Sequence, residues 1–333
     1  MNRKIRIDDT ELKTTIVIPN YNGIEYLKAC LKSLYECENR DFAIIVVDNG
    51  SSDGSAAYIR DTYPEVKLIA LEENTGFAPA VNRGIEASDT EYVLLLNNDI
   101  EVSTDFVRCM EESLDSHPKA FSVSARMLSM HNKELLDGTG DYYCALGWAF
   151  ACGKGKRAQD RYLKERKLTS ACAGAAIYRR EELVKMGAFD ELHFAYLEDV
   201  DVGLRARIEG FDNIYEPKAV CYHAGSGFSG SRHNEFKVTL SSRNSVYIIY
   251  KNMPLLQFII NLPFLLIGFI VKALFFAMKG LGLTYVKGLG EGLKLSFGKE
   301  GRKHKVRFKW GNLGHYVRLQ LELWRNLVFF VIL

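Results

Sequence analysis

Residues 14–97 alternate short apolar runs with helical patterns, and this alternation constrains the fold more than any other feature. The apolar runs are residues 14–19, 43–48, 66–71 and 92–97. Helical patterns lie at 24–35, at 56–62, where Ser55 is in position to cap, and within 74–87. Strands separated by helices of about ten residues indicate βαβ units. We therefore expect an α/β domain with a mostly parallel sheet that is flanked by helices.

Polar residues stand where three of the predicted strands end. They are Asn20-Tyr21-Asn22, Asp48-Asn49 and Asn97-Asn98-Asp99. Open α/β sheets bind ligands at the carboxyl ends of their strands, so residues 14–102 are predicted to form a nucleotide-binding half-domain. The sequence has neither G-x-G-x-x-G after the first strand nor G-x-x-x-x-G-K-[ST], which argues against dinucleotide binding and P-loop chemistry.

The stretch YVLLLNNDIEV, from Tyr92 to Val102, ends a core strand in two amides and one carboxylate. A plain loop is one interpretation of this end. The other is a metal site that lacks one carboxylate and keeps Asp99.

The middle of the chain mixes helical and irregular patterns. Helices are expected at 104–116 and 181–187. The segment FAYLEDVDVGLRARIEG (194–210) is predicted to become an amphipathic helix that carries Val200, Leu204 and Ile208 on one face. Gly210 is a suitable residue to end it.

Two arginines of that helix, Arg205 and Arg207, are expected to pair with Asp201 or neighbouring acids on the helix surface. Residues 138–175 are rich in Gly, Ala and aromatic side chains and show little periodicity. We predict that they form a mobile loop region over the site. Residues that select a substrate are expected within 120–175.

Five residues carry the chemistry that the sequence suggests. Asp48 and Asp99 end strands, Glu198-Asp199 opens a helix, and His223 follows a strand-like run. An Asp and a His at strand ends suit a hard divalent ion that neutralises a diphosphate, and a separate carboxylate can accept a proton from a hydroxyl. Structural interpretations remain open: Asp48 in a turn, Glu198 and Asp199 as charges at a helix N-terminus, and His223 as a structural histidine.

The C-terminal part differs in composition. Residues 254–278 carry one charge, Lys272, and contain Asn261 and Pro263. A membrane-spanning helix needs about 20 mainly apolar residues, so this length suffices. From Lys279 onward, eleven Lys or Arg residues stand against three Glu, although the whole chain has a net charge of only +2.

Three interpretations of this part compete. The favoured one is helices that lie in the membrane interface, held by apolar faces and by basic side chains on anionic lipid. A spanning hairpin and a buried soluble helix are the alternatives, and oligomerisation is a further role for the same surface.

The seven cysteines are scattered, and none forms a C-x-x-C pair. An odd number without paired spacing favours a reducing compartment over a disulfide framework or a zinc site. The segment MNRKIRIDDTELK has no apolar core, so no secretory signal is expected.

Five motifs together resemble the family 2 glycosyltransferases. In order they are TIVIPNYNG, VVDNGSSDGS, NTGFAPAVNRGI, YVLLLNND and AYLEDVDVGLRARIEG, and they lie within residues 14–252. Within that family the chain looks most like bacterial rhamnosyltransferase-type enzymes of cell-surface polysaccharide synthesis. The resemblance implies a GT-A fold over residues 1–252, with a nucleotide-binding half at 14–102 and an acceptor half at 103–252. A helical membrane-associating tail would then occupy 253–333.

The resemblance also implies roles for residues of the nucleotide-binding half. Asp48 matches the strand-end Asp that hydrogen-bonds the base of the donor. Pro19 and Tyr21 match positions that line the base and ribose pocket. Gly76 and Asn82 match the loop and helix that close over the nucleotide.

The NND sequence matches the D-x-D motif of the family. Asp99 would be the direct ligand of Mg²⁺ or Mn²⁺, while Asn97, with Asn98 beside it, would contact the ribose or a metal-bound water. His223 matches a histidine that completes the metal site in some members. Asp199 matches the catalytic base, which accepts the proton of the acceptor hydroxyl.

Glu198 and Arg243 are expected to contact the diphosphate or the acceptor. The implied reaction is an inverting transfer from a nucleoside-diphosphate sugar such as dTDP-rhamnose. The acceptor would be a saccharide or a polyprenyl-diphosphate-linked saccharide at the cytoplasmic face of the cell membrane. The enzyme would be peripheral or would insert a short C-terminal segment, and no nucleic-acid partner is expected.

Three alternatives compete with this interpretation. A sugar-1-phosphate nucleotidyltransferase would need a Gly-rich, basic loop after the first strand, where this chain has PNYNG. A processive synthase would need several spans and a Q-x-x-R-W motif. An inactive carbohydrate-binding scaffold is disfavoured because Asp48, Asp99, Asp199 and His223 are all intact.

Overall fold

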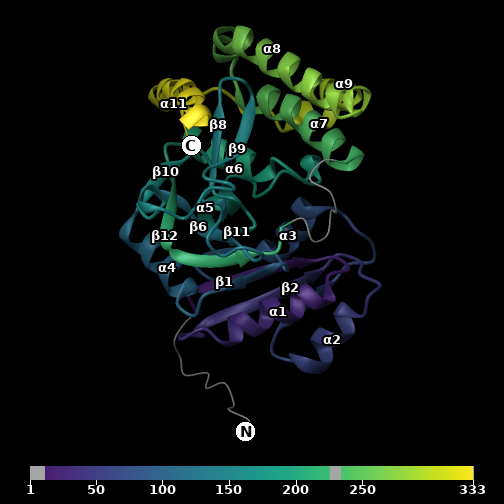
Figure 1. Ribbon diagram of the computed structural model, residues 1–333, viewed down its shortest axis with the longest axis vertical. Coiled ribbons are helices and arrows are strands. Elements are labelled where there is room, and N and C mark those ends of the chain that lie inside the picture. Colours follow the sequence, from purple (N-terminus) through teal and green to yellow (C-terminus); the bar gives the residue numbers. More distant parts are fainter. Residues whose placement is uncertain (1–11, 226–233, 333) are drawn as a thin grey trace.

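A computed structural model describes residues 12–225 and 234–332 (Figure 1). The predicted parallel half of the sheet is confirmed: β1 lies between β2 and β4, and β3 pairs with β2, all in parallel. These strands are β1 (Thr14–Asn20), β2 (Phe42–Asp48), β3 (Lys67–Ala70) and β4 (Tyr92–Leu96). The connecting helices are α1 (Ile24–Tyr35), α2 (Ser55–Thr62) and α3 (Phe77–Glu86). The carboxyl ends of β1 and β2 are in register, with Asn20 beside Asp48.

The second half of the chain extends the same sheet. Strand β11 pairs antiparallel with both β4 and β6, and so joins the two halves. Strand β12 runs parallel to β6 and pairs antiparallel with β5 and β10. These strands are β5 (Ile100–Val102), β6 (Ala120–Ser129), β7 (Leu136–Gly138), β10 (Arg166–Leu168), β11 (Ala175–Arg179) and β12 (Asp212–His223).

Each face of the sheet has its own core, because successive side chains of a strand point to opposite faces. Ile16 and Ile18 pack under α1 and α4 (Phe106–Ser116), whereas Val17 between them packs under α3 and α6 (Glu198–Ile208). The expected helices at 104–116 and 181–187 are confirmed within a few residues as α4 and α5 (Arg180–Lys185).

The predicted cap of α2 is wrong. Ser55 is the first residue of the helix and follows Gly54, whose φ of 88° turns the chain. Asp53 performs the expected role: its carboxylate accepts the backbone N–H of Ser55 at 3.0 Å and that of Ile24 at 2.9 Å. One carboxylate therefore binds the starts of two helices.

The predicted mobile loop over 138–175 is also wrong. This region contains the hairpin of β8 (Asp141–Cys144) and β9 (Trp148–Ala151), together with β7 and β10. The hairpin is supported from outside its own sequence, because Asn326 donates to the carbonyl of Tyr143 at 2.8 Å. Strands this short, stabilised by contacts with distant residues, show no periodicity in the sequence.

Helix α6 matches its predicted range but is not a surface helix. Val200, Leu204 and Ile208 pack against the C-terminal helices, while other residues of α6 face the sheet. Both arginines are buried. Arg205 pairs with Asp201 at 2.9 Å, as expected from i,i+4 spacing, but away from solvent.

Arg207 also departs from the expected surface pairing. It pairs with Asp212 at the start of β12 and with Glu322 of the C-terminal helix α11 (Leu313–Ile332). Because both faces of α6 are covered, Arg205 and Arg207 pair with carboxylates inside the protein and not on its surface.

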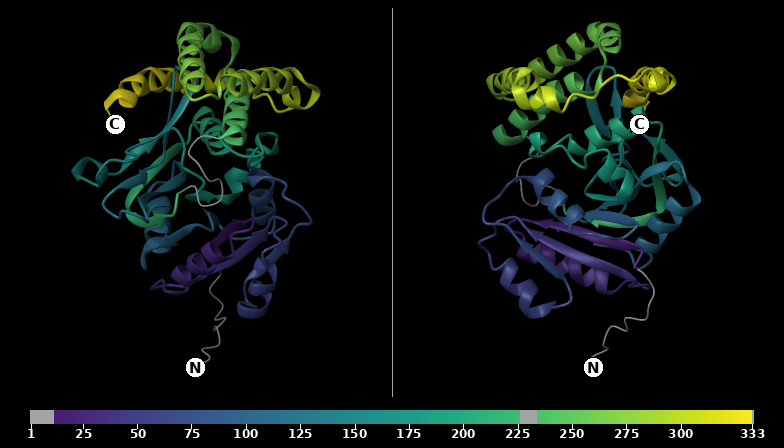
Figure 2. Two further views of the ribbon diagram at one scale, coloured as in Figure 1. Left: turned by 45° about the vertical axis from the view of Figure 1, so that its right-hand side comes forward. Right: turned by 180° about the vertical axis from the view of Figure 1, so that it is seen from behind.

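Helices α7 to α11 form a layer at the end of the molecule opposite α1 and α2 (Figures 1 and 2). They are α7 (Glu235–Asn252), α8 (Leu255–Met278), α9 (Gly282–Phe297), α10 (Lys299–Lys303) and α11 (Leu313–Ile332). Helix α8 runs unbroken through Asn261 and Pro263. Asn261 is buried and exchanges two hydrogen bonds with Gln320 of α11, at 2.8 and 2.9 Å.

Helix α8 is long and apolar enough to cross a membrane, and only 17% of its most apolar window is buried inside the molecule. That exposure argues against the interpretation of a buried soluble helix. The choice between a spanning and an interfacial helix, and the domain boundary at residue 252, stay predictions.

Candidate active site

The polar strand ends meet in one hydrogen-bonded group at the carboxyl edge of the sheet. Asn20 donates to Asp48 at 2.9 Å and accepts from Asn98 at 2.6 Å. The other carboxylate oxygen of Asp48 accepts the backbone N–H of Ser51 at 3.1 Å, and the side chain is buried. The structure thus brings Asp48 and the NND motif together through Asn20.

The other residues predicted to bind the nucleotide surround this group. Pro19 and Tyr21 are half-buried on either side of Asn20. Gly76 has a φ of +97°, and a Cβ at this position would lie 2.6 Å from the ring of Phe194. Only glycine fits such a close approach with this backbone.

Asn82 makes contacts that the sequence did not suggest. Its side chain donates to the carbonyl of Phe189 at 2.8 Å and accepts the N–H of the same residue at 3.0 Å. It also donates to Glu191 at 3.0 Å. Asn82 therefore fixes the segment that leads toward α6.

Asp99 and His223 are brought together because β5 and β12 pair, with Ile100 opposite His223. Nε2 of His223 lies 3.3 Å from Oδ2 of Asp99. Its Nδ1 lies 2.6 Å from Asp137, which also pairs with Lys154 at 2.8 Å. Burial disfavours the charged imidazole, but the contacts with Asp137 and Asp99 outweigh it and raise the pKa of His223 to about 9.

These residues fit a divalent ion of the expected kind. A carboxylate oxygen and an imidazole nitrogen lie side by side, and both are ligands of Mn²⁺-type sites. Asp137 contacts the opposite ring nitrogen, as carboxylate partners of metal-binding histidines do. The sequence analysis missed Asp137, since only the pairing of β6 with β7 brings it near His223.

Asp199 lies in the first turn of α6 and is partly buried. It accepts the backbone N–H of Ala173 at 3.3 Å and that of Val200 at 2.8 Å. Burial raises its pKa above the usual range, which favours a carboxylate that accepts a proton. Glu198 is buried, and its Oε2 has no hydrogen-bond partner among the described residues.

Two further side chains adjoin Asp199. Asp141 and Cys172 each place a ligand atom within 4.8 Å of a carboxylate oxygen of Asp199 and of one another. Burial, together with the charge of Asp199, raises the pKa of Asp141 to about 8. No local pattern around Asp141 could have identified it, because the β8–β9 hairpin delivers it to the site.

The segment before α6 is strained. Phe194, Tyr196 and Leu197 have φ angles of 62°, 70° and 68°, a region that side chains other than glycine rarely adopt. Arg243 and Asn244 of α7 hold this segment through its carbonyls, with Asn244 donating to Ala195 and Tyr196 at 2.9 and 2.7 Å.

Arg243 itself donates to the carbonyls of Leu192 and His193 at 3.0 and 2.7 Å. The structure therefore places Arg243 on the segment that positions Asp199. A contact between Arg243 and a diphosphate or an acceptor stays a prediction.

A parallel half, an adjoining mixed half, and an Asp–His pair with a separate carboxylate are the arrangement expected of a GT-A glycosyltransferase. The chain belongs to glycosyl transferase family 2, whose model matches residues 15–186. The predicted family, fold and enzyme class are thereby confirmed.

Two relatives indicate the chemistry within the family. The N-acetylglucosaminyl-diphospho-decaprenol L-rhamnosyltransferase of Mycobacterium tuberculosis is 25% identical over 263 residues, covering 69% of this chain and 84% of that protein. The poly-β-1,6-N-acetyl-D-glucosamine synthase of Staphylococcus epidermidis is 27% identical over 204 residues, covering 61% and 47%. The first relative supports the resemblance to rhamnosyltransferase-type enzymes.

Solved structures agree on the fold. S. aureus TarS 1-349 in complex with UDP-GlcNAc has a TM-score of 0.59 at 17% identity, covering 85% of this chain and 81% of that one. GalNAc-T7 with UDP, GalNAc and Mn²⁺ has a TM-score of 0.58 at 15% identity, covering 73% and 48%. The mannosyltransferase PcManGT from Pyrobaculum calidifontis, with GDP-Man and Mn²⁺, has a TM-score of 0.52 at 18% identity, covering 93% and 84%.

Proposed function

We propose that this enzyme transfers a sugar, with inversion, from a nucleoside-diphosphate sugar to a lipid-linked saccharide acceptor. One observation carries the proposal. The carbonyl of Gly174 accepts the N–H of Asn97 at 2.8 Å, and the N–H of the adjacent Ala173 donates to Asp199 at 3.3 Å. The NND motif and the carboxylate base therefore border the same short segment, which suits a donor diphosphate and an acceptor hydroxyl that must meet.

The residues at the carboxyl ends of β1, β2 and β4 would bind the nucleotide of the donor. Asp48 would accept a hydrogen bond from the base, in the pocket bordered by Pro19 and Tyr21. Asn97 and Asn98 would bind the ribose through amide hydrogen bonds, without adding charge. Gly76 would let the loop that precedes α3 approach the nucleotide closely.

Asp99 and His223 would hold a divalent ion, Mg²⁺ or Mn²⁺. Such an ion neutralises the charge that develops on a departing diphosphate. Asp137 would orient His223 so that Nε2 faces the ion. Two of the structural neighbours contain Mn²⁺, which supports this assignment.

Asp199 would accept the proton of the acceptor hydroxyl as that oxygen attacks the anomeric carbon from the face opposite the diphosphate. A single displacement inverts the configuration of that carbon. Glu198 and Asp141 adjoin Asp199. Burial, together with the charge of Asp199, raises the pKa of both side chains. Either could donate a hydrogen bond to the acceptor sugar while protonated.

The relative from M. tuberculosis is named for transfer of L-rhamnose to a diphospho-decaprenol-linked sugar. By analogy, we infer a donor such as dTDP-rhamnose and a polyprenyl-diphosphate-linked acceptor. The exposed α8 and the basic residues beyond it would hold the enzyme at the cytoplasmic face of the membrane.

The decisive experiment offers the enzyme a panel of nucleotide-sugars with a lipid-linked acceptor, with and without Mn²⁺, and measures released nucleoside diphosphate. Asp199→Asn should lower turnover by about 10²–10⁴-fold, the usual contribution of a general base, with donor affinity nearly unchanged. The exposed Asp89→Asn is the matched control. Wild-type turnover in Asp199→Asn would remove Asp199 from this role.

A further inference from the structure

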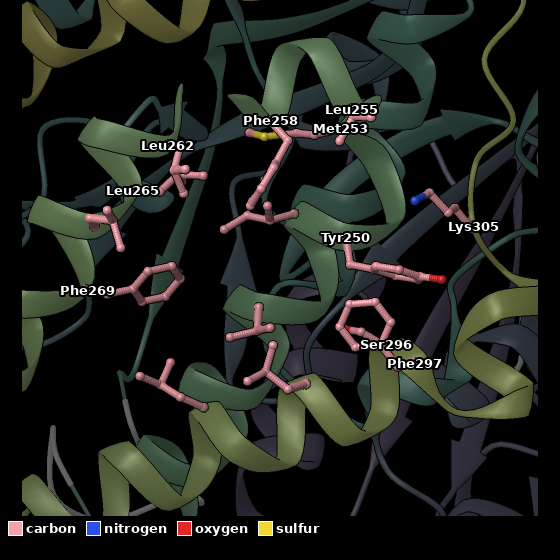
Figure 3. Close-up of a pocket in the computed structure, with 15 residues that line it drawn as sticks. Tyr250, Met253, Leu255, Phe258, Leu262, Leu265, Phe269, Ser296, Phe297 and Lys305 are labelled. Atoms are coloured by element: carbon pink, nitrogen blue, oxygen red, sulfur yellow. The ribbon is translucent and has the colours of Figure 1, made fainter. Parts of the chain in front are cut away.

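An apolar groove of about 510 Å³ lies between α7, α8 and α9 (Figure 3). Leu262 and Leu266 of α8 form one wall, Leu293 and Phe297 of α9 form another, and Tyr250 of α7 lies between them. Its volume is that of a site for a small organic molecule, but its lining is almost wholly apolar, with Tyr250, Ser296 and Lys305 as its polar side chains. The chemistry of its lining suits a hydrocarbon chain.

The groove opens onto an exposed apolar surface. Leu266, Leu293 and Phe297 are each more than half exposed, and many other large apolar side chains of α8, α9 and α11 are exposed as well. An exposed apolar surface of this extent indicates contact with a membrane or a partner. Since α8 is long and apolar enough for a bilayer, a lipid chain could enter the groove without crossing water.

The rim of the groove is cationic. Nζ of Lys305 lies 4.3 Å over the ring of Tyr250 and forms no ion pair among the described residues. A shallower depression lined by Arg302, Lys303 and Arg307 also involves Lys305. Of these four side chains, Lys303 pairs with Glu300, so the rim keeps surplus positive charge. A phosphate group at the end of a hydrocarbon chain would complement it.

Two elements connect the groove to the catalytic carboxylate. The tip of the β8–β9 hairpin meets the groove, where a Cβ on Gly147 would lie 3.0 Å from Leu265 and 3.2 Å from Ile249, both lining residues. The base of the hairpin is Asp141, beside Asp199. Six residues of extended chain span at most about 20 Å, so the groove and the site are near neighbours.

The second connection runs through the cationic rim. His304, next to Lys305, lies 2.9 Å from Asp190 through its Nδ1. Lys251 bridges Asp190 and Asp201, at 2.6 and 2.8 Å, and Asp201 is on the same turn as Asp199. The rim is therefore fixed to the N-terminus of the catalytic helix.

We propose that the groove binds the isoprenoid chain of the lipid-linked acceptor, with the acceptor diphosphate on Lys305 and its basic neighbours. The proposal rests on the proposed function and adds the place where the carrier lipid binds. An ordinary phospholipid offers similar chemistry, but it would not need a groove connected to Asp199 through two elements.

The test labels the full-length protein with a benzophenone-tagged farnesyl diphosphate in detergent, without any donor, and maps the labelled peptides by mass spectrometry. Leu266→Trp should fill the groove and lower labelling of α7–α9 by about tenfold. Ile267→Trp is the matched control, because Ile267 is equally exposed, at 55% against 54%, but does not line the groove. Leu293→Trp with Val286→Trp repeats the comparison on α9, should a variant of α8 fail to fold.

Competition identifies the ligand. Undecaprenyl diphosphate should suppress labelling and phosphatidylglycerol should not. Lys305→Gln should weaken the diphosphate competitor about tenfold and leave undecaprenol unchanged, since a charge-assisted contact is lost. Three results would overturn the proposal. One is an equal loss of labelling in Leu266→Trp and Ile267→Trp. The others are labels spread over the whole apolar surface and equal competition by phosphatidylglycerol.

The outcomes also separate this proposal from the proposed function. A protein that releases nucleoside diphosphate from its donor but is not labelled in the groove contradicts the lipid site alone. A protein labelled in the groove that binds no nucleotide-sugar contradicts the glycosyl transfer.

Discussion

Replacing Lys251 with Met should destabilise the protein strongly. Lys251 is 4% exposed and donates to Asp190 at 2.6 Å and to Asp201 at 2.8 Å, joining α7 to the segment before α6 and to α6 itself. Removing one partner of a buried ion pair typically costs about 3–5 kcal/mol, because the remaining charge stays buried without compensation.

The structure places the expected cost at the lower end of that range. Asp201 would keep Arg205 at 2.9 Å and Asn252 at 2.8 Å. Asp190 would keep Tyr247 at 2.8 Å. We therefore expect a loss of about 3 kcal/mol in the free energy of unfolding, measured by urea denaturation of the membrane-free protein in mild detergent.

The matched control is Lys309→Met. Lys309 pairs with Glu209 at 2.8 Å, but its side chain is 62% exposed, so its loss should cost less than about 1 kcal/mol. The reasoning is refuted if Lys251→Met lies within about 1 kcal/mol of the wild-type protein, or if the two variants are equally destabilised.

The same network predicts a pH dependence. Burial alone would raise the pKa values of Asp201 and Asp190. At Asp201, Lys251 and Arg205 outweigh burial and hold the pKa well below its usual range. At Asp190, Lys251 is the main group that outweighs burial and lowers the pKa. A lowered folded-state pKa gives stability that is present above the ordinary carboxyl range, near pH 4, and is lost as the pH falls below it. Lys251→Met should lose less stability than wild type between about pH 5 and pH 3.

Three further predictions concern the site. Asp99→Ala should lower sugar transfer far more than Asn97→Ala, because only Asp99 carries charge toward the ion; equal losses in a turnover assay would contradict this. Asp137→Asn should weaken Mn²⁺ binding by about 10–100-fold, as measured by titration calorimetry with nucleotide present, because His223 loses its orienting partner; unchanged affinity would argue against that role. Gly76→Ala should destabilise the protein by about 1–3 kcal/mol, since its φ of +97° and the contact with Phe194 both exclude a Cβ; a thermal melt that matches wild type would show that the loop moves freely.

Much of the parallel half of the fold could be predicted because its signals are local. Strands such as 43–48 and 92–97 are continuous apolar runs that end in polar residues, and parallel order follows from the helices between them. Asp99 and His223 were also predicted together, from their places at strand ends and from the resemblance. Their distance of 3.3 Å depends on the register of β5 with β12, which neither segment encodes alone.

The strands within residues 138–175 could not be predicted from the sequence, and the reason is physical. They are three or four residues long, too short to show a period, and distant helices stabilise them. Tyr142 packs against Phe329, and Trp148 against Phe330, both from α11. Asp141 therefore lies beside Asp199 on a hairpin that packs against α11.

The sequence by itself determined the class of fold, the strand ends that gather polar side chains, and the presence of an apolar, basic C-terminal part. Those features rest on composition and on periods of two and 3.6 residues, which the chain carries locally. Only the tertiary structure decided that α6 is buried on both faces, that Asp137 and Asp141 join the site, and that α7–α9 enclose a groove. Each of these features depends on contacts between segments that are far apart in the chain. Such contacts form only when the whole chain packs, so no local stretch of sequence encodes them.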